Sequence, residues 1–146
     1  RLRRTLSKVG RAGGRRGYMR GPKAWSAESD KVRPPYNISV LNDEGALFAL
    51  EHSEVFAAQA VDLRTQRAIL SEELQGLRGV TVWPSDANMI LARVPDAGKA
   101  FDGMKAHGVL VKNVSKMHPL LANCLRLTVG TAQENVKMLA ALQESL

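Results

Sequence analysis

The chain has 146 residues, of which 45% are hydrophobic and 24% are charged, a composition typical of folded domains that excludes the disordered and fibrous classes. Its net charge of +7 is local, because residues 1–23 hold nine of the 21 Lys and Arg and no acidic residue. The rest of the chain holds twelve basic and all fourteen acidic residues. A basic surface over the whole protein, of the kind that binds nucleic acids or membranes, is therefore not expected.

Residues 1–52 predict a basic, irregular start followed by helices. Residues 10–23 contain five Gly and one Pro among basic side chains, which predicts a turn-rich loop with one short extended piece near 16–19. Pro34-Pro35 forces extended backbone just before it, so a helix is expected to end near Val32.

Two further helices are predicted over residues 39–51 and 53–77. Ser53 is the expected N-cap of the second, and Gly76 and Gly79 supply its stop signals. Such a helix is about 35 Å long, which is enough to bridge two domains.

The remaining sequence predicts short strands alternating with helices. Apolar runs at 80–83 and 89–94 flank the turn-forming Pro84-Ser85-Asp86 and predict an antiparallel pair. Asp96 is the expected cap of a helix that Gly108 ends. Two more strands are predicted at 109–112 and 125–129, and Thr131 is the expected cap of a last helix with an apolar face of Val136, Leu139 and Leu142. This order predicts a small α+β domain over 53–146, with a short mixed sheet covered by helices.

The single Cys124 excludes an internal disulfide and is interpreted as a small buried hydrophobe. His52, His107 and His118 have no partners at metal-ligand spacing, so no metal site is predicted. No apolar run approaches the roughly 20 residues that cross a bilayer. We therefore expect a cytoplasmic protein that contacts neither a membrane nor nucleic acid.

Three motifs carry a resemblance to a known family. The first motif is Arg4-Thr5-Leu6-Ser7-Lys8 followed by Ala12-Gly13-Gly14-Arg15-Arg16-Gly17-Tyr18. The second is Ser85-Asp86-Ala87-Asn88 with Ile90-Leu91, and the third is residues 123–131, with the sequence NCLRLTVGT. In this order and spacing they resemble the fold-type I pyridoxal-phosphate (PLP) aminotransferases, and most closely the histidinol-phosphate aminotransferases. The resemblance implies an α/β PLP-transferase fold, with 1–52 as the end of its large domain and 53–146 as its small C-terminal domain.

The resemblance makes Lys8 the residue that holds PLP. A lysine amine bonds covalently to the aldehyde of PLP and then carries a proton between carbon atoms, and a neighbouring cation lowers its pKa toward neutrality. Without the downstream motifs, Lys8 would read as an ordinary solvated lysine of a basic segment.

The resemblance assigns the PLP phosphate to Thr5, Ser7 and an arginine, which together offer hydroxyl donors and positive charge. The register of Ala12, Gly13, Gly17 and Tyr18 selects Arg15, whereas spacing from the lysine in many relatives selects Arg16. Arg15 is preferred on the Gly and Tyr register, because the loop after Lys8 is one residue shorter than in those relatives.

Arg126 is the predicted anchor for the anionic group of the substrate. It interrupts an apolar strand, where an unpaired guanidinium is costly unless an anion or a helix acid meets it. In the family, the arginine at this position grips a carboxylate or a phosphate with two hydrogen bonds. Lys112 stands where some relatives have a second anion-binding arginine, and its role stays open.

The family's partner for the pyridine nitrogen and its stacking aromatic ring precede the lysine, so the chain is expected to be the C-terminal part of a longer enzyme, inactive alone and homodimeric when complete. Its substrates would be small amino and keto acids, with an amino group moved between histidinol phosphate and 2-oxoglutarate. Two nearer alternatives are an aromatic aminotransferase and a threonine-phosphate decarboxylase. A distant one is an RGG-like nucleic-acid-binding module, because arginines and glycines alternate from Gly10 to Gly21.

Overall fold

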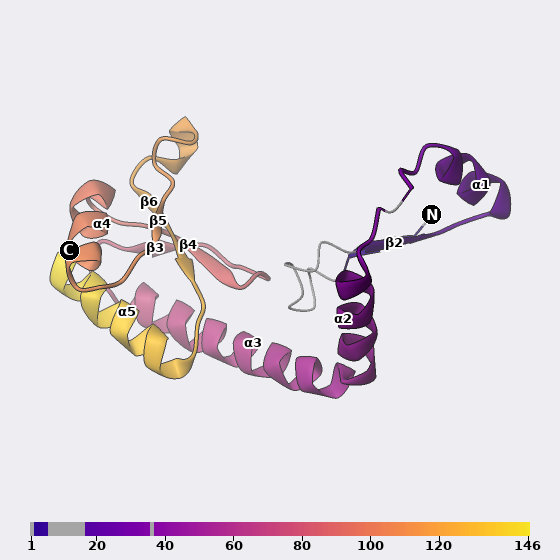
Figure 1. Ribbon diagram of the computed structural model, residues 1–146. Helices are drawn as coiled ribbons and strands as arrows, with labels where there is room; N and C mark the ends of the chain where they lie inside the picture. Colours follow the sequence, from indigo (N-terminus) through magenta and orange to yellow (C-terminus); the bar gives the residue numbers. More distant parts are fainter. Residues whose placement is uncertain (1, 6–16, 36) are drawn as a thin grey trace. The chain divides into compact units, whose positions relative to one another are not determined.

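The computed structural model describes residues 2–5, 17–35 and 37–146. The chain divides into two compact units, Arg1–Ala60 and Val61–Leu146. The boundary between them falls inside the long helix α3 (Ser53–Gln75), which confirms the predicted long helix to within two residues at its C-terminal end (Figure 1).

The first unit begins with a pair of short antiparallel strands, β1 (Leu2–Thr5) and β2 (Gly17–Arg20). Leu2 lies opposite Arg20, and Thr5 lies opposite Gly17. Helix α1 (Lys23–Lys31) follows directly after Pro22, whose fixed φ suits the start of a helix, and it ends before Pro34-Pro35 as predicted.

Helix α2 (Val40–Glu51) begins at Ser39, whose hydroxyl accepts the Asn42 N–H at 3.3 Å. The expectation that Ser53 caps α3 is wrong, because the Val55 N–H already donates to the His52 carbonyl and Ser53 is the first helical residue. Most large apolar side chains of α2 and of the first turns of α3 are exposed, namely Val40, Leu41, Leu47, Phe48, Leu50 and Val55.

The second unit contains a four-stranded sheet of β3 (Thr81–Val82), β4 (Met89–Arg93), β5 (Lys112–Asn113) and β6 (Cys124–Thr128). The spatial order is β3-β4-β6-β5, and each neighbouring pair is antiparallel. The expectation of a mixed sheet is therefore wrong. β4 and β5 do point the same way, but β6 lies between them, so the two parallel strands never pair.

Strand β5 is shorter than predicted. β6 pairs with Lys112 and Asn113 only, so the apolar residues 109–111 have no strand partner. Instead, the Val109 N–H donates back to the Met104 carbonyl, and Gly108 before it has φ +72°, a left-handed conformation that closes helix α4 (Ala97–Ala106). The predicted antiparallel pair of β3 and β4 is confirmed.

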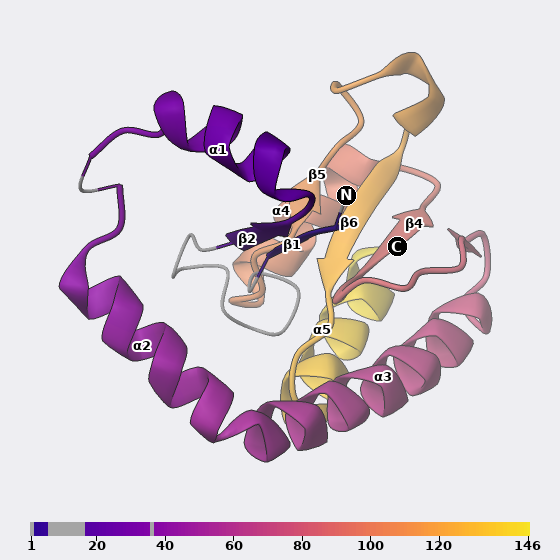
Figure 2. The ribbon, with the colours of Figure 1, turned by 90° about the vertical axis from the view of Figure 1, so that its right-hand side faces the viewer.

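Helices α4, α5 (Ala132–Ser145) and the last turns of α3 pack on one face of this sheet (Figure 2). Their core is made of small and branched apolar side chains, with Leu74, Ile90, Met104, Leu125, Leu127 and Leu142 fully buried. The predicted caps are confirmed: the Asp96 carboxylate accepts two N–H groups of α4, and Thr131 and Glu134 form a capping box at α5.

The buried face of α5 differs from the predicted one. Leu142 is buried and Leu139 packs partly buried against the core, as predicted, but Val136 is 68% exposed. The buried set is Asn135, Met138, Ala141, Leu142 and Ser145. Two polar residues belong to this face because both have partners inside the unit. Asn135 bonds Gly130 and Gln66, and the Ser145 hydroxyl donates to the Ala141 carbonyl at 2.6 Å.

None of the helices in the described part of the chain has both the length and the apolar character needed to cross a membrane.

Candidate functional site

The lysine motif falls largely outside the described residues: Ser7, Lys8, Arg15 and Arg16 lie between the two described strands of the first unit. Thr5 is the last residue of β1, and its backbone pairs with Gly17 at the start of β2. Neighbouring strands lie about 5 Å apart. Thr5 and Gly17 are therefore close in space, and in the sequence Ser7 and Lys8 follow Thr5 within three residues while Arg15 precedes Gly17 by two.

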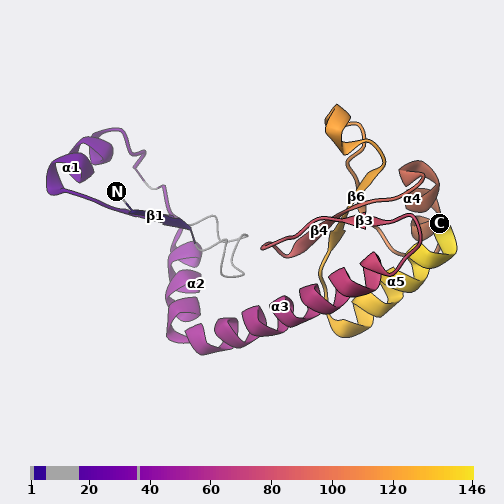
Figure 3. The same ribbon diagram turned by 180° about the vertical axis from the view of Figure 1, so that it is seen from behind.

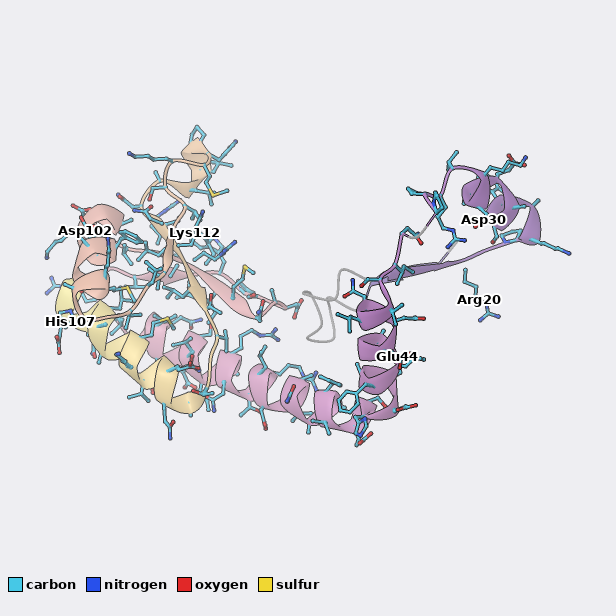
Figure 4. The ribbon with its side chains drawn as sticks, in the orientation of Figure 1. Arg20, Asp30, Glu44, Asp102, His107 and Lys112 are labelled. Atoms are coloured by element: carbon cyan, nitrogen blue, oxygen red, sulfur yellow. The ribbon has the colours of Figure 1, made fainter. Side chains whose placement is uncertain are left out.

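Arg126 lies at the centre of the sheet face that the helices leave uncovered. In β6 it is exposed between the buried Leu125 and Leu127. Its register partners are Leu91 on β4 and Lys112 on β5. Directly opposite residues share one face of a sheet, with Cβ atoms about 5 Å apart. The exposed Lys112 is therefore the immediate neighbour of Arg126; its place on the sheet is labelled in Figure 4.

This pair of cations has no counter-ion among the described side chains. Neither Arg126 nor Lys112 makes a hydrogen bond or ion pair to another described side chain, and two like charges directly opposite on a sheet destabilise it. The alternative in which Arg126 forms a structural ion pair with a helix acid therefore finds no partner among the described residues. An exposed guanidinium beside an ammonium is suited to hold a carboxylate or a phosphate.

Two asparagines fix β5 and β6 relative to the start of α4. The Asn113 amide donates to the Ala97 carbonyl at 3.1 Å, and the Ala97 N–H points to Oδ1 of Asn123 at 3.5 Å. Asn123 is in the left-handed region with φ 57°, and its carbonyl accepts the Val94 N–H. The adjoining ends of β5 and β6, the strands that carry Lys112 and Arg126, are thus hydrogen-bonded to the first turn of α4.

The turn after β6 is equally constrained. Oδ1 of Asn135 accepts the Gly130 N–H at 2.9 Å, and its amide donates to the Gly130 carbonyl and to Gln66 of α3. Next to it, the backbone N–H and the hydroxyl of Thr131 both donate to the Glu134 carboxylate, which lowers the pKa of Glu134. The strand that carries Arg126 is therefore anchored at both ends.

The cysteine and two of the histidines considered in the sequence analysis are buried or bonded within the second unit. Cys124 is fully buried, as predicted. His107 closes α4, with Nδ1 on the Gly103 carbonyl and Nε2 2.9 Å from the Glu144 carboxylate, and Nδ1 of His118 accepts the Leu120 N–H in the turn η3 (Pro119–Leu121). The His, Cys, Asp and Glu side chains of residues 2–5, 17–35 and 37–146 form no cluster that could hold a metal ion.

Sequence reasoning missed Asn113, Asn123 and Asn135, which hold the ends of β5 and β6. It also missed Arg93, which bonds the Leu120 and Ala122 carbonyls. Asparagine is enriched in the left-handed region, which could have marked Asn123. The partners of the others lie up to 69 residues away along the chain, so no local pattern reveals them.

Comparison with known proteins gives one consistent result. The chain is 70% identical over 145 residues to the histidinol-phosphate aminotransferase of Polaromonas naphthalenivorans (strain CJ2) and 65% identical over 146 residues to that of Acidovorax sp. (strain JS42). Both matches cover 99% of this chain and 40% of the relative. The chain therefore spans about two fifths of the length of these relatives. No protein-family model matches it.

Solved structures agree on the fold. A putative aminotransferase from Burkholderia pseudomallei matches with a TM-score of 0.86 and 26% identity, over 97% of this chain and 44% of that one. The histidinol-phosphate aminotransferase of Sinorhizobium meliloti, solved in complex with pyridoxal-5'-phosphate, matches with a TM-score of 0.78 and 24% identity, over 98% and 40%. Over nearly its whole length the chain is thus similar in sequence to the C-terminal portion of histidinol-phosphate aminotransferases, and it shares the fold of the solved aminotransferase structures.

Proposed function

We propose that this chain forms the C-terminal part of a PLP-dependent transaminase that moves an amino group between histidinol phosphate and 2-oxoglutarate. The observation that carries the proposal is the 70% identity to a histidinol-phosphate aminotransferase over 99% of the chain. The uncovered pair of Arg126 and Lys112 supports it, because both substrates carry an anionic group that such a pair can bind.

The residues of the first motif fit PLP by their chemistry. PLP supplies a reactive aldehyde and an electron-withdrawing ring, and it carries a phosphate dianion. Lys8 offers the amine that bonds to such an aldehyde, while Thr5, Ser7 and Arg15 offer two hydroxyls and a guanidinium for the phosphate. The pairing of Thr5 with Gly17 supports this grouping, because Ser7, Lys8 and Arg15 lie between these two paired residues in the sequence.

Each residue then has a distinct task. Nζ of Lys8 would hold the cofactor and, once displaced by the substrate amine, would move a proton between the substrate carbon that carries nitrogen and the aldehyde carbon of the cofactor. Arg126 orients the substrate by its carboxylate or phosphate, with Lys112 adding a point charge beside it. Because the amino donor and the amino acceptor use the site in turn, one anion pocket serves both.

A homodimer in the cytoplasm is the assembly we infer for the complete enzyme, as the resemblance implies.

A decarboxylase is the less favoured alternative. L-threonine-O-3-phosphate decarboxylase from Porphyromonas gingivalis has the same fold, with a TM-score of 0.81, but only 23% identity, and its substrate also carries a phosphate. An anion pocket alone does not separate the two reactions. The much higher identity to histidinol-phosphate aminotransferases favours transamination.

The proposal is tested on the intact enzyme that contains this chain. Borohydride reduction traps the covalent link between PLP and its lysine, and peptide mass mapping is expected to find the pyridoxyl group on Lys8. Lys8→Arg keeps the charge without an amine that can form the link, so transamination should be lost. A pyridoxyl group on another lysine, or full activity of Lys8→Arg, would overturn the assignment.

A further inference from the structure

Arg93, the last residue of β4, ties that strand to a distant loop. Its Nη2 donates to the Leu120 carbonyl at 2.7 Å, and its Nε donates to the Ala122 carbonyl at 3.1 Å. The guanidinium carbon also lies 5.2 Å from the centre of the Trp83 ring, within the range of a cation–π contact. The half-buried Arg93 thus meets three separate groups of the second unit.

The loop that Arg93 holds, residues 114–123, joins Lys112 on β5 to Arg126 on β6. It extends from the sheet on the side away from α3 and α5 and contains η3 (Figures 1 and 3). Only two residue pairs join β5 to β6, so the sheet alone holds β5 weakly. The Leu120 and Ala122 carbonyls belong to the last turn of the loop, immediately before β6 begins at Cys124. The hydrogen bonds from Arg93 to these two carbonyls therefore fix the point at which β6 begins.

Arg93 differs from Arg126 in that its guanidinium already has partners within the protein. It pairs with Cys124, two residues along the register from the Leu91–Arg126 pair, and so belongs to the same sheet face. However, its Nε and Nη2, which form one two-pronged edge of the guanidinium, are used by carbonyls of the protein. Arg126 has no such partner among the described residues.

We propose that Arg93 is a positioning residue for the anion pocket, which it serves by holding loop 114–123 and thereby the spacing of Lys112 and Arg126. The inference rests on the proposed function, because it assumes that these two cations grip the substrate. Only a planar guanidinium can bridge two carbonyls while lying on an indole ring. Lysine is therefore a poor substitute at this position.

The test uses the intact enzyme with Arg93→Met, which keeps the length of the side chain but removes its donors, and Arg93→Lys, which keeps the charge. Arg78→Met, at an exposed arginine of the same unit, is the matched control. Arg93→Met is expected to raise the Michaelis constants of both substrates by about tenfold, with kcat and PLP content retained, because small displacements of binding groups are costly. Hydrogen exchange should speed up in peptides covering 116–123. Arg93→Lys should show the same changes in smaller measure, and Arg78→Met should show neither.

The outcomes separate this inference from the proposed function. Faster exchange in loop 114–123 with unchanged Michaelis constants would mean that Arg93 stabilises the loop without affecting substrate binding, and would overturn the proposal. If Arg126→Lys raises the Michaelis constants while Arg93→Met does not, the anion pocket stands and the positioning role fails. If neither variant does so, the anion pocket itself is wrong. Should Arg93→Met not fold, Arg93→Lys decides by the same two measurements.

Discussion

At the scale of single residues, the side chains proposed to bind the substrate differ from those that hold the backbone of the second unit in place. Arg126 and Lys112 lie on the open sheet face without partners among the described side chains, whereas the side chains of Asn113, Asn123 and Asn135 each form hydrogen bonds to backbone groups around them. Sequence patterns single out Arg126 as a candidate, because an arginine stands among the apolar residues of its strand, and its role in binding stays a prediction. They could not predict the asparagines, whose bonds are set by how helices and strands meet in space.

The first prediction concerns Arg126. In the intact enzyme Arg126→Lys keeps the charge but loses the two-pronged hydrogen bond, so substrate binding should weaken by roughly 2–4 kcal/mol while PLP is retained. Steady-state kinetics should show a raised Michaelis constant for both glutamate and histidinol phosphate. The reciprocal variant Lys112→Arg gains a planar fork and should leave both constants unchanged or lower. An unchanged Michaelis constant in Arg126→Lys would assign Arg126 to structure.

At the scale of elements, the N-caps of α4 and α5 could be predicted from the sequence, but the buried face of a helix could not. Asp96 and Thr131 are caps because short polar side chains before an apolar periodic run satisfy free N–H groups, which is a local effect. The buried face of α5 depends on its neighbours: Val136 is exposed, while Asn135 is buried because Gly130 and Gln66 satisfy its amide. Likewise, a mixed sheet was expected because nothing local shows that β6 lies between β4 and β5.

The second prediction concerns the capping box of α5. The Thr131 N–H and hydroxyl donate to ionised Glu134, so the folded-state pKa of Glu134 lies below its unfolded value. This contribution to stability is complete above the unfolded pKa and is lost as pH falls through the folded pKa. Unfolding measured from neutral to acid pH should show this loss in the native chain and not in Glu134→Gln, which keeps the length of the side chain without the charge. Parallel pH profiles for the two proteins would contradict it.

The third prediction concerns the close crossing of α4 and α5. A Cβ on Gly103 would meet the Ser145 side chain, with Cβ of Ser145 at 2.7 Å and its Cα at 3.4 Å. Gly103→Ala should therefore destabilise the second unit by about 1–3 kcal/mol in denaturant unfolding, despite the better helix propensity of alanine. Combining it with Ser145→Gly removes the collision, so the double variant should be more stable than the two single effects added. Strict additivity would mean that the helices do not meet there.

At the scale of the whole molecule, the two units differ in how well they bury their own apolar residues. The second has a continuous core that joins three helices to one sheet. In the first, Ala49 is the only buried apolar side chain among the described residues, while Leu41 is 85% and Phe48 54% exposed. Apolar surface of this kind usually packs against another element. The difference is in keeping with a chain that spans about two fifths of its relatives' length.

The last prediction follows from that difference. The 146-residue chain, purified alone, should hold a folded second unit, because residues 61–146 bury apolar side chains from both central strands and from α3 and α5 in a single core. Hydrogen exchange should therefore be slow in β4 and β6 and fast in α2. The same chain should show no measurable transamination and at most weak PLP binding, because Thr5, Ser7, Lys8 and Arg15 are only part of the cofactor contacts that the resemblance implies. The intact enzyme, assayed for PLP absorbance and turnover in the same buffer, is the control. Robust turnover by the isolated chain would show that these four residues and Arg126 suffice for the reaction.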